Sequence, residues 1–210
     1  MAKTESFTPD FSFEVALIGK GARLVAGTDE VGRGPLAGCV LSAAVILDPE
    51  RIPQGLNDSK KLSAKRREEL FEEICATATV SYASVSAYEI DQTDIRKASL
   101  ESMRLAVARL EKRPDHVLVD GNAIPPNLGI PATFIIKGDA RSASISAAAI
   151  VAKVVRDRMM KEACLQYPGY GFSKHAGYGT AEHLEAIARL GPTPIHRMSF
   201  RPLKDRPRHG

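Results

Sequence analysis

Apolar residues in this chain occur in short runs and in periodic stripes, and the two patterns predict different elements. Five runs have the length, β-branched content or alternation typical of strands: 24–28, 36–47, 79–86, 116–120 and 133–136. The first two flank a Gly-Arg-Gly-Pro segment and predict a hairpin. The fourth has a short apolar run at 117–119, which indicates a buried parallel strand.

Four helices are predicted from capping residues and helical spacing. Ser63, Ser142 and Thr180 stand where a helix N-cap would lie, ahead of helices that reach about residues 76, 166 and 190. A further helix is predicted between the first two of these. Its apolar residues over 100–110 recur at steps of three and four, and Pro114 ends the pattern. Small residues in the helix over 142–166 allow close packing.

The order of these elements predicts an α/β fold with a mixed five-stranded sheet flanked by helices. Residues 1–22 are expected to form an irregular arm, and 23–200 one domain whose part from about 142 onward is a small helical extension. The basic tail over 201–210 is expected to be mobile. With 210 residues, 44% of them apolar and 26% charged, the composition excludes disordered, collagen-like and coiled-coil chains.

Charge and cysteine content indicate the kind of partner and the cellular compartment of the protein. The formal net charge of +4, from 29 basic and 25 acidic residues, suits a polyanionic partner without demonstrating one. The three cysteines show no paired spacing, which indicates a reducing compartment. The N-terminus does not have the pattern of a signal peptide, and the apolar stretch over 34–47 is too short to span a bilayer. We therefore expect a cytoplasmic protein.

Four acidic residues stand at or near the ends of predicted strands. Asp29 and Glu30 follow the first strand, Asp120 ends the fourth, and Asp139 precedes the long helix. Carboxylates that converge at one sheet edge repel one another unless cations lie between them, and oxygen ligands suit Mg²⁺ or Mn²⁺. A pair of such ions supports phosphodiester hydrolysis. Taken singly, Asp120 is as readily a turn residue, and Asp139 an N-cap or turn residue.

Several loops offer groups that suit a nucleic-acid backbone. Gly32, Arg33 and Gly34 can present main-chain N–H groups and a guanidinium to a phosphate, or form an ordinary hairpin turn. The segment 57–61, with Ser59 and Lys60, has the small polar and basic side chains that bind phosphates. Aromatic and basic residues interleave over 168–179, which is typical of a stacking surface and equally of a packed loop.

Other motifs are absent or have a structural interpretation. The sequence lacks the glycine fingerprint of dinucleotide-binding proteins and the P-loop of nucleoside triphosphatases. It also lacks the G-x-S-x-G motif of serine hydrolases. His183 and His196 are interpreted as structural, and Asp157 as part of a helix-surface ion pair. The basic residues 65–67 are interpreted as a solvated helix face.

Seven segments, in this order, resemble the motifs of bacterial ribonuclease HII. They are 26–38 (AGTDEVGRGPLAG), 57–63 (NDSKKLS), 119–122 (VDGN), 137–139 (KGD), 147–157 (AAAIVAKVVRD), 175–180 (HAGYGT) and 194–197 (PIHR). The resemblance covers about residues 24–200. It implies a ribonuclease H-like fold and cleavage of RNA in RNA–DNA hybrids, including a lone ribonucleotide in duplex DNA, on the 5′ side, with 3′-hydroxyl and 5′-phosphate ends.

The same resemblance implies roles for individual residues. The four carboxylates would hold two Mg²⁺ or Mn²⁺ ions, with Asp139 acting more on the second. The turn over 32–34 would contact the ribose 2′-hydroxyl and its phosphate, and Tyr178 would stack on the adjacent deoxyribose. The implied partner is hybrid or ribonucleotide-containing duplex, and a monomer is expected. A nucleic-acid-binding module without catalysis and a nuclease with another substrate are the alternatives.

Overall fold

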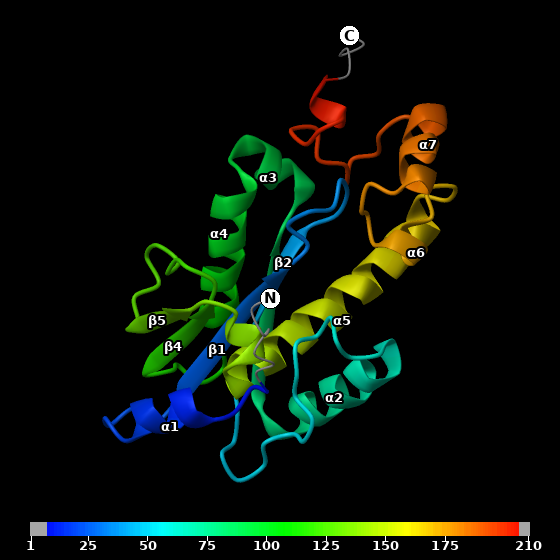
Figure 1. Ribbon diagram of the computed structural model, residues 1–210. Helices are drawn as coiled ribbons and strands as arrows, with labels where there is room; N and C mark the ends of the chain where they lie inside the picture. The colour runs from blue at the N-terminus through cyan, green and yellow to red at the C-terminus, as the bar shows by residue number, and fades with distance from the viewer. Residues whose placement is uncertain (1–7, 206–210) are drawn as a thin grey trace, which may run out of the picture.

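The computed structural model describes residues 8–205 and has one mixed five-stranded sheet at its centre (Figure 1). The strands lie in the order β3-β2-β1-β4-β5. β1 is antiparallel to β2 and parallel to β4, β2 is antiparallel to β3, and β4 is parallel to β5. Their bounds are Val25–Val31, Val40–Ile46, Thr79–Val85, His116–Asp120 and Ala132–Ile135. The predicted fold class is confirmed and each of the five predicted strands is present, although β1 runs on to Val31 and β2 begins only at Val40.

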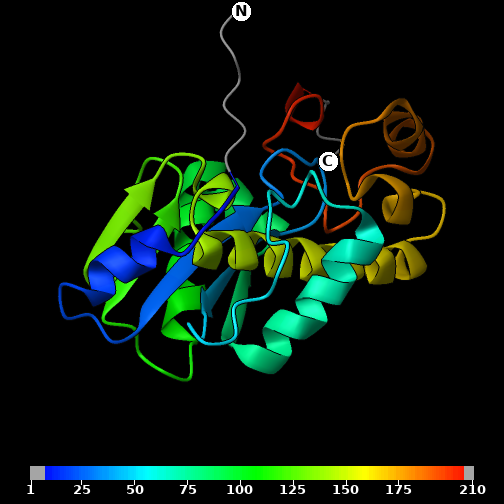
Figure 2. The same ribbon diagram turned by 60° about the horizontal axis from the view of Figure 1, so that its bottom comes forward.

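Helices cover both faces of this sheet (Figures 1 and 2). On one face lies α4 (Ile95–Ala108), packed on β1, β2 and β3. On the other, α5 (Ala143–Gln166) crosses β1 and β2, and α2 (Ala64–Thr77) packs beside it. Because side chains alternate along a strand, Leu41 of β2 enters the core under α2 and α5, while Ala44 enters the core under α4.

Three helix starts were predicted at the right residue. The hydroxyls of Ser63, Ser142 and Thr180 accept hydrogen bonds from the main-chain N–H three residues further on, and so cap α2, α5 and α7 (Ala181–Leu190). Each cap satisfies a donor that the first helical turn leaves without an intrahelical partner. The small residues of α5 are buried, which allows its backbone to approach the sheet closely.

The prediction of an irregular arm over 1–22 is wrong within the described residues, because Ser12–Ile18 form helix α1. Phe13 and Leu17, one turn apart, pack against the β1–β4–α5 core. Glu14 is fully buried and accepts hydrogen bonds from the hydroxyl of Ser142, at 2.6 Å, and from the N–H of Ser144, at 2.9 Å. This carboxylate therefore ties α1 to the start of α5. Residues 1–7 lie outside the described residues.

The predicted tail also differs from the structure. Leu203 is buried in the C-terminal core, and Leu203–Asp205 form a 3-10 turn. The basic tail beyond it, 206–210, lies outside the described residues.

Two short helices were not predicted: α3 (Ala87–Gln92), which begins with a capping box of Ser86 and Glu89, and α6 (Phe172–His175). The α4 helix ends at Ala108, ahead of Pro114.

The apolar run over 36–47 is a strand only from Val40. Its first residues instead join the C-terminal lobe, which α6, α7 and the chain beyond them form at one end of the molecule (Figure 1). The N–H of Leu36 donates to the carbonyl of Gly177, and that of Gly38 to the carbonyl of Ile195. This segment was predicted as strand because a buried loop and a buried strand have the same apolar composition.

His183 and His196 of the lobe are structural, as predicted. His183 and His196 are buried, their Nε2 atoms lie 3.1 Å apart, and both rings pack against Phe172. Asp157 pairs with Lys153 on the surface of α5, also as predicted. No helix within residues 8–205 has both the length and the apolar character needed to cross a membrane.

Candidate active site

Three of the predicted acids meet at one edge of the sheet. Asp29 and Glu30 lie inside β1, near its end, and Asp120 is the last residue of β4. In the parallel register of these strands Thr28 pairs with Val119, so Asp29 and Asp120 follow at the same level. One carboxylate oxygen from each of the three acids lies within 4.8 Å of the other two. The main chain therefore brings these carboxylates together.

Main-chain donors orient two of the three carboxylates. Oδ1 of Asp29 accepts a hydrogen bond from the N–H of Glu30 at 2.7 Å, and Oδ1 of Asp120 accepts one from the N–H of Gly138 at 2.7 Å. Glu30 is held by Arg33, whose Nη1 lies 3.1 Å from Oε1. Each acid is thus held in position by a main-chain N–H group or by a guanidinium.

Burial and mutual repulsion make this cluster costly when every acid is charged. Asp29 is only 8% exposed, and burial, followed by repulsion from Asp120, Glu30 and Asp139, raises its pKa well above the ordinary value. Burial also raises the pKa of Glu30, against the opposing effect of Arg33. The protein thus holds negative charge where water stabilises it poorly, which is the arrangement that a bound cation relieves.

Asp139 lies beside this cluster, outside the 4.8 Å group. It sits in the 3-10 turn Gly138–Ala140 that leads into α5. Burial, and then repulsion from Asp120, raises its pKa. Nζ of the exposed Lys60 lies 3.9 Å from its Oδ2. The fourth predicted acid is therefore close enough to be repelled by Asp120 and Asp29, and it also forms an ion pair with Lys60.

The donor set fits a hard divalent cation. All the candidate ligand atoms of Asp29, Glu30 and Asp120 are carboxylate oxygens, which Mg²⁺ and Mn²⁺ prefer to nitrogen or sulfur. Three acids in so small a space supply enough charge to bind such an ion. A structural ion pair is a poorer account of the cluster, since Arg33 contacts only Glu30 among the three.

The Gly-Arg-Gly turn lies directly after these acids in the chain and next to Tyr178. Gly32 is buried, whereas Arg33 and Gly34 are exposed. A Cβ atom at Gly34 would lie 3.4 Å from Cε1 of Tyr178, whose side chain is 48% exposed. Two of the predicted substrate-contacting elements, separated by more than 140 residues, therefore form one surface beside the carboxylates.

The loop over 57–62 brings Lys60 next to Asp139. Ser59 is buried, and its carbonyl accepts a hydrogen bond from Nη1 of Arg67 at 2.9 Å. The same guanidinium nitrogen donates to the carbonyl of Leu62. Arg67 is thus a brace for this loop, and the prediction of a solvated face over 65–67 is wrong for it.

Several residues near the site were not identified from the sequence. Arg96 of α4 and Asn122 line a small recess of about 50 Å³ together with Glu30, Arg33 and Asp120. No sequence signal distinguishes Arg96 from other helix-surface arginines. Asn122 belongs to the segment VDGN, but its side chain was given no role. Arg156 and Arg197, discussed below, were also missed.

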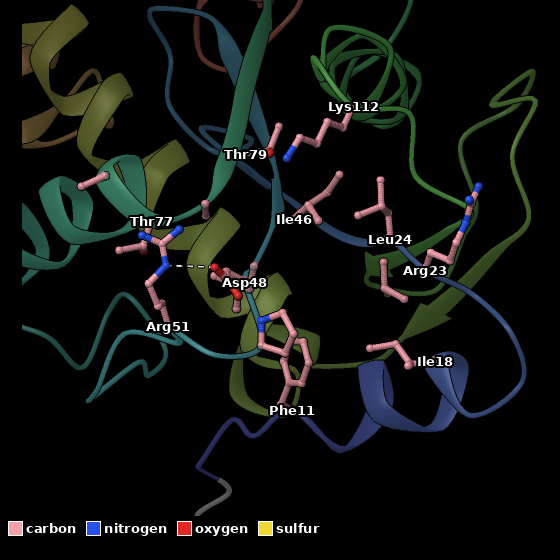
Figure 3. A pocket seen from close by; sticks show the side chains of 15 residues that line it. Phe11, Ile18, Arg23, Leu24, Ile46, Asp48, Arg51, Thr77, Thr79 and Lys112 are labelled. Atoms are coloured by element: carbon pink, nitrogen blue, oxygen red, sulfur yellow. Dashed lines mark hydrogen bonds and ion pairs between the residues drawn. The ribbon is translucent and has the colours of Figure 1, made fainter.

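A larger hollow of about 390 Å³ lies elsewhere, where β1 begins and β2 ends (Figure 3). Its walls include Leu24 and Ile46, with Arg51 paired to Asp48 on its rim. The acids stand near the other end of β1. This hollow is therefore separate from the candidate active site.

A mixed sheet of this order, with clustered carboxylates at the ends of two neighbouring parallel strands, defines the class as a metal-dependent nuclease of the ribonuclease H type. Comparison with solved structures gives the same class. The ribonuclease H2 from Pyrococcus horikoshii superposes with a TM-score of 0.74 at 26% identity, over 87% of this chain and 96% of that one. The ribonuclease HII of Archaeoglobus fulgidus, solved with PCNA, gives 0.73 at 29% identity, over 85% and 95%.

Sequence comparison identifies the family. The profile described as Ribonuclease HII matches residues 26–202. Ribonuclease HII of Rhizobium etli is 60% identical over 201 residues, covering 96% of this chain and 88% of its own. That of Ruegeria pomeroyi is 55% identical over 193 residues, covering 92% and 82%. The chain belongs to the ribonuclease HII family and is a metal-dependent enzyme that hydrolyses RNA in RNA–DNA hybrids.

Proposed function

We propose that this enzyme cuts the RNA strand of RNA–DNA hybrids, and duplex DNA that carries one ribonucleotide, on the 5′ side of the ribonucleotide, leaving 3′-hydroxyl and 5′-phosphate ends. The observation that carries the proposal is the cluster of Asp29, Glu30 and Asp120, whose oxygens lie within 4.8 Å of one another. The family supports the substrate class, and the cluster supports the reaction type.

Four carboxylates would hold two divalent ions, Mg²⁺ or Mn²⁺. Asp29, Glu30 and Asp120 would form the primary ligand set, and Asp139 would contribute to holding the second ion. When bound, such a pair lowers the pKa of water and stabilises the charge of the leaving oxygen. The contribution of this chain is to hold the carboxylates in place through the main-chain donors of Glu30 and Gly138 before any ion arrives.

The turn over 32–34 would test for the ribose 2′-hydroxyl. In a duplex that group is reached from the minor groove, and a main chain without a side chain at Gly34 can approach it closely. Tyr178 stands against Gly34 and would stack on the sugar of the next nucleotide. Lys60, which lies beside Asp139, and Ser59 of the same loop would contact the flanking phosphates. The substrate would thus lie across the carboxylates between these two loops.

A labelled DNA duplex with one ribonucleotide tests this function. We expect cleavage with Mg²⁺ or Mn²⁺ and none with EDTA, and an all-DNA duplex should stay intact. Asp157→Asn, which changes a surface acid paired with Lys153, is the matched control for Asp29→Asn. Tight binding without cleavage in either metal would replace the proposal with a binding module, and cleavage of the all-DNA duplex with a nuclease of another specificity.

Two further parts of the proposal concern the setting of the enzyme. We expect it to act as a monomer, which size-exclusion chromatography with light scattering checks directly. We expect it to act in the cytoplasm, where its substrate would be produced during replication of bacterial DNA. Fractionation of cells that produce the tagged chain tests that location.

A further inference from the structure

Two arginines with nearly complete burial lie beneath the Gly-Arg-Gly turn. Arg156 of α5 is 1% exposed and Arg197 is fully buried, and they are the largest fully buried side chains of the described residues. Burying a guanidinium is costly unless every one of its N–H groups finds an acceptor. Neither arginine forms an ion pair with a carboxylate of the described residues. Their partners are main-chain carbonyls.

Arg197 binds the turn itself. Its Nη2 donates to the carbonyl of Gly32 at 2.6 Å, its Nη1 to that of Arg33 at 2.9 Å, and its Nε to that of Gly38 at 2.9 Å. One planar fork thus fixes three carbonyls of a single loop. A lysine could not do this, because it offers one nitrogen without a fixed geometry.

Arg156 joins that loop to the Tyr178 loop. Its Nε donates to the carbonyl of Cys39 at 3.0 Å, its Nη2 to that of Ala37 at 3.2 Å, and its Nη1 to that of Ala176 at 3.1 Å. It also packs against Gly32, where φ is +92° and a Cβ atom would lie 2.2 Å from Nε of Arg156. Only glycine fits at position 32, because any side chain there would collide with the guanidinium of Arg156.

The opposite side of the same peptides faces outward. Arg33 and Gly34 are both exposed, and their main-chain N–H groups donate no hydrogen bond to any group within residues 8–205. With the carbonyls of Gly32 and Arg33 directed inward to Arg197, the peptide planes are set so that their N–H groups can serve a ligand. Exposed donors above buried positive charge are what an anionic ligand requires.

Burial lowers the pKa of both guanidinium groups, and both keep their positive charge. Burial, and then repulsion from Arg156, lowers the pKa of Arg197 to about 10. Burial also lowers the pKa of Arg156. Arginine keeps its proton in proteins, so both groups are cationic at neutral pH and repel each other. Asp157 and Asp91 attract them from beyond ion-pair distance, and no carboxylate of the described residues pairs with either guanidinium. A phosphate bound at the turn would supply the missing negative charge.

We propose that Arg156 and Arg197 are positioning residues for ribonucleotide recognition, which hold the turn over 32–34 and the Tyr178 loop in register and provide the positive charge beneath the phosphate next to the ribose. The inference rests on the proposed function, since it assigns a cause to the recognition proposed for that turn. It adds the two residues on which the shape and the charge of the recognition surface depend.

The test compares Arg197→Lys and Arg156→Lys with Arg158→Lys, a matched change on α5 at an exposed arginine that pairs with Glu68. Dissociation constants are measured in EDTA for two duplexes that differ only in one ribonucleotide. Both buried variants should lose at least about tenfold of the preference for the ribonucleotide, because a main-chain contact is misplaced. Arg158→Lys should retain it. Circular dichroism and thermal unfolding show that each variant is folded at the assay temperature.

A preference unchanged in folded Arg197→Lys and Arg156→Lys would overturn the inference and leave the proposed function standing. A wild-type chain that binds both duplexes equally would also overturn the inference, whereas a wild-type chain that cuts neither duplex in Mg²⁺ or Mn²⁺ would overturn the proposed function itself. A second measurement needs no variant: in ¹⁵N NMR spectra of the wild type, the ribonucleotide duplex should shift the amide signals of Arg33 and Gly34 and the Nε–H signals of Arg156 and Arg197 more than the all-DNA duplex does. Equal shifts of the Nε–H signals would also overturn it.

Discussion

Replacing Asp29 by asparagine should make the metal-free protein more stable while abolishing its activity. Asparagine has nearly the same shape and keeps Oδ1, which accepts the hydrogen bond from the N–H of Glu30. What it removes is one negative charge from a buried cluster. Stability and activity should therefore change in opposite directions, which few substitutions in a core do.

The size of the stabilisation follows from the spacing of the oxygens. At 4.8 Å two unit charges repel each other by about 3.5 kcal/mol at an effective dielectric constant of about 20. Asp29 faces two such partners, Glu30 and Asp120. Arg33 offsets part of the charge on Glu30, and the raised pKa of Asp29 means that partial protonation relieves some of the strain. We therefore expect a net gain of about 2 kcal/mol, or roughly 4–8 °C in the unfolding midpoint.

Thermal unfolding in EDTA and in Mg²⁺ measures this effect, together with single-turnover cleavage of a duplex that carries one ribonucleotide. Mg²⁺ should stabilise the wild type and leave Asp29→Asn almost unchanged, while the cleavage rate of the variant falls about 10³-fold or more. Asp157→Asn should stay within about 0.5 kcal/mol of the wild type and cleave normally. An Asp29→Asn protein that is less stable than the wild type in EDTA, or that still cleaves, would contradict this prediction.

Three further predictions follow from the same geometry. Because burial and like charge raise the pKa of Asp29 above its value in the unfolded chain, its ionisation costs stability as pH rises; the advantage of Asp29→Asn in EDTA should therefore grow from pH 4 to pH 8 in urea titrations, and a shrinking advantage would contradict this. Tyr178→Ala should slow cleavage at a single ribonucleotide by about tenfold with little loss of duplex affinity, as measured by comparing kcat with Kd, and unchanged turnover would count against stacking. Glu14→Ala should destabilise the fold by about 3 kcal/mol in urea unfolding, since it leaves the Ser142 hydroxyl and the Ser144 N–H without their buried acceptor; a change below about 0.5 kcal/mol would show that α1 does not anchor α5.

Features with a local cause were predictable from the sequence. Ser63, Ser142 and Thr180 mark helix starts because the cap bonds a main-chain N–H only three residues away. The run over 116–120 is a strand because its three consecutive branched apolar residues, 117–119, are all buried when they lie inside a sheet. The capping box of Ser86 and Glu89 is equally local, so helix α3 was predictable by the same criterion and was overlooked.

Features that depend on distant partners were not predictable in this way. Helix α1 is stabilised by Glu14, whose acceptor role exists only once Ser142 and Ser144 lie beside it, 128 and 130 residues along the chain. Arg197 reads as one more basic residue until the fold places three carbonyls around it. Arg156 had a usable signal, because it follows Ala148 and Ala152 at four-residue steps on the buried face of α5.

The acids of the site lie between these extremes. Asp29, Glu30 and Asp120 could be placed at one edge because parallel strands end on the same side of a sheet. Their separation could not be derived, since it depends on the β1–β4 register. Asp139 shows the difference: it follows the neighbouring strand β5, yet it lies outside the 4.8 Å group because the 3-10 turn Gly138–Ala140 carries it to the Lys60 side.

The central claim is that the carboxylate cluster, loaded with divalent ions, cuts where a ribonucleotide stands. The most direct test uses a set of otherwise identical duplexes in which the single ribonucleotide is moved one position at a time, with either end of its strand labelled. We predict that the cut follows the ribonucleotide, always on its 5′ side, in Mg²⁺ or Mn²⁺ and never in EDTA. A cut that stays at a fixed position, or that persists in EDTA, would contradict it.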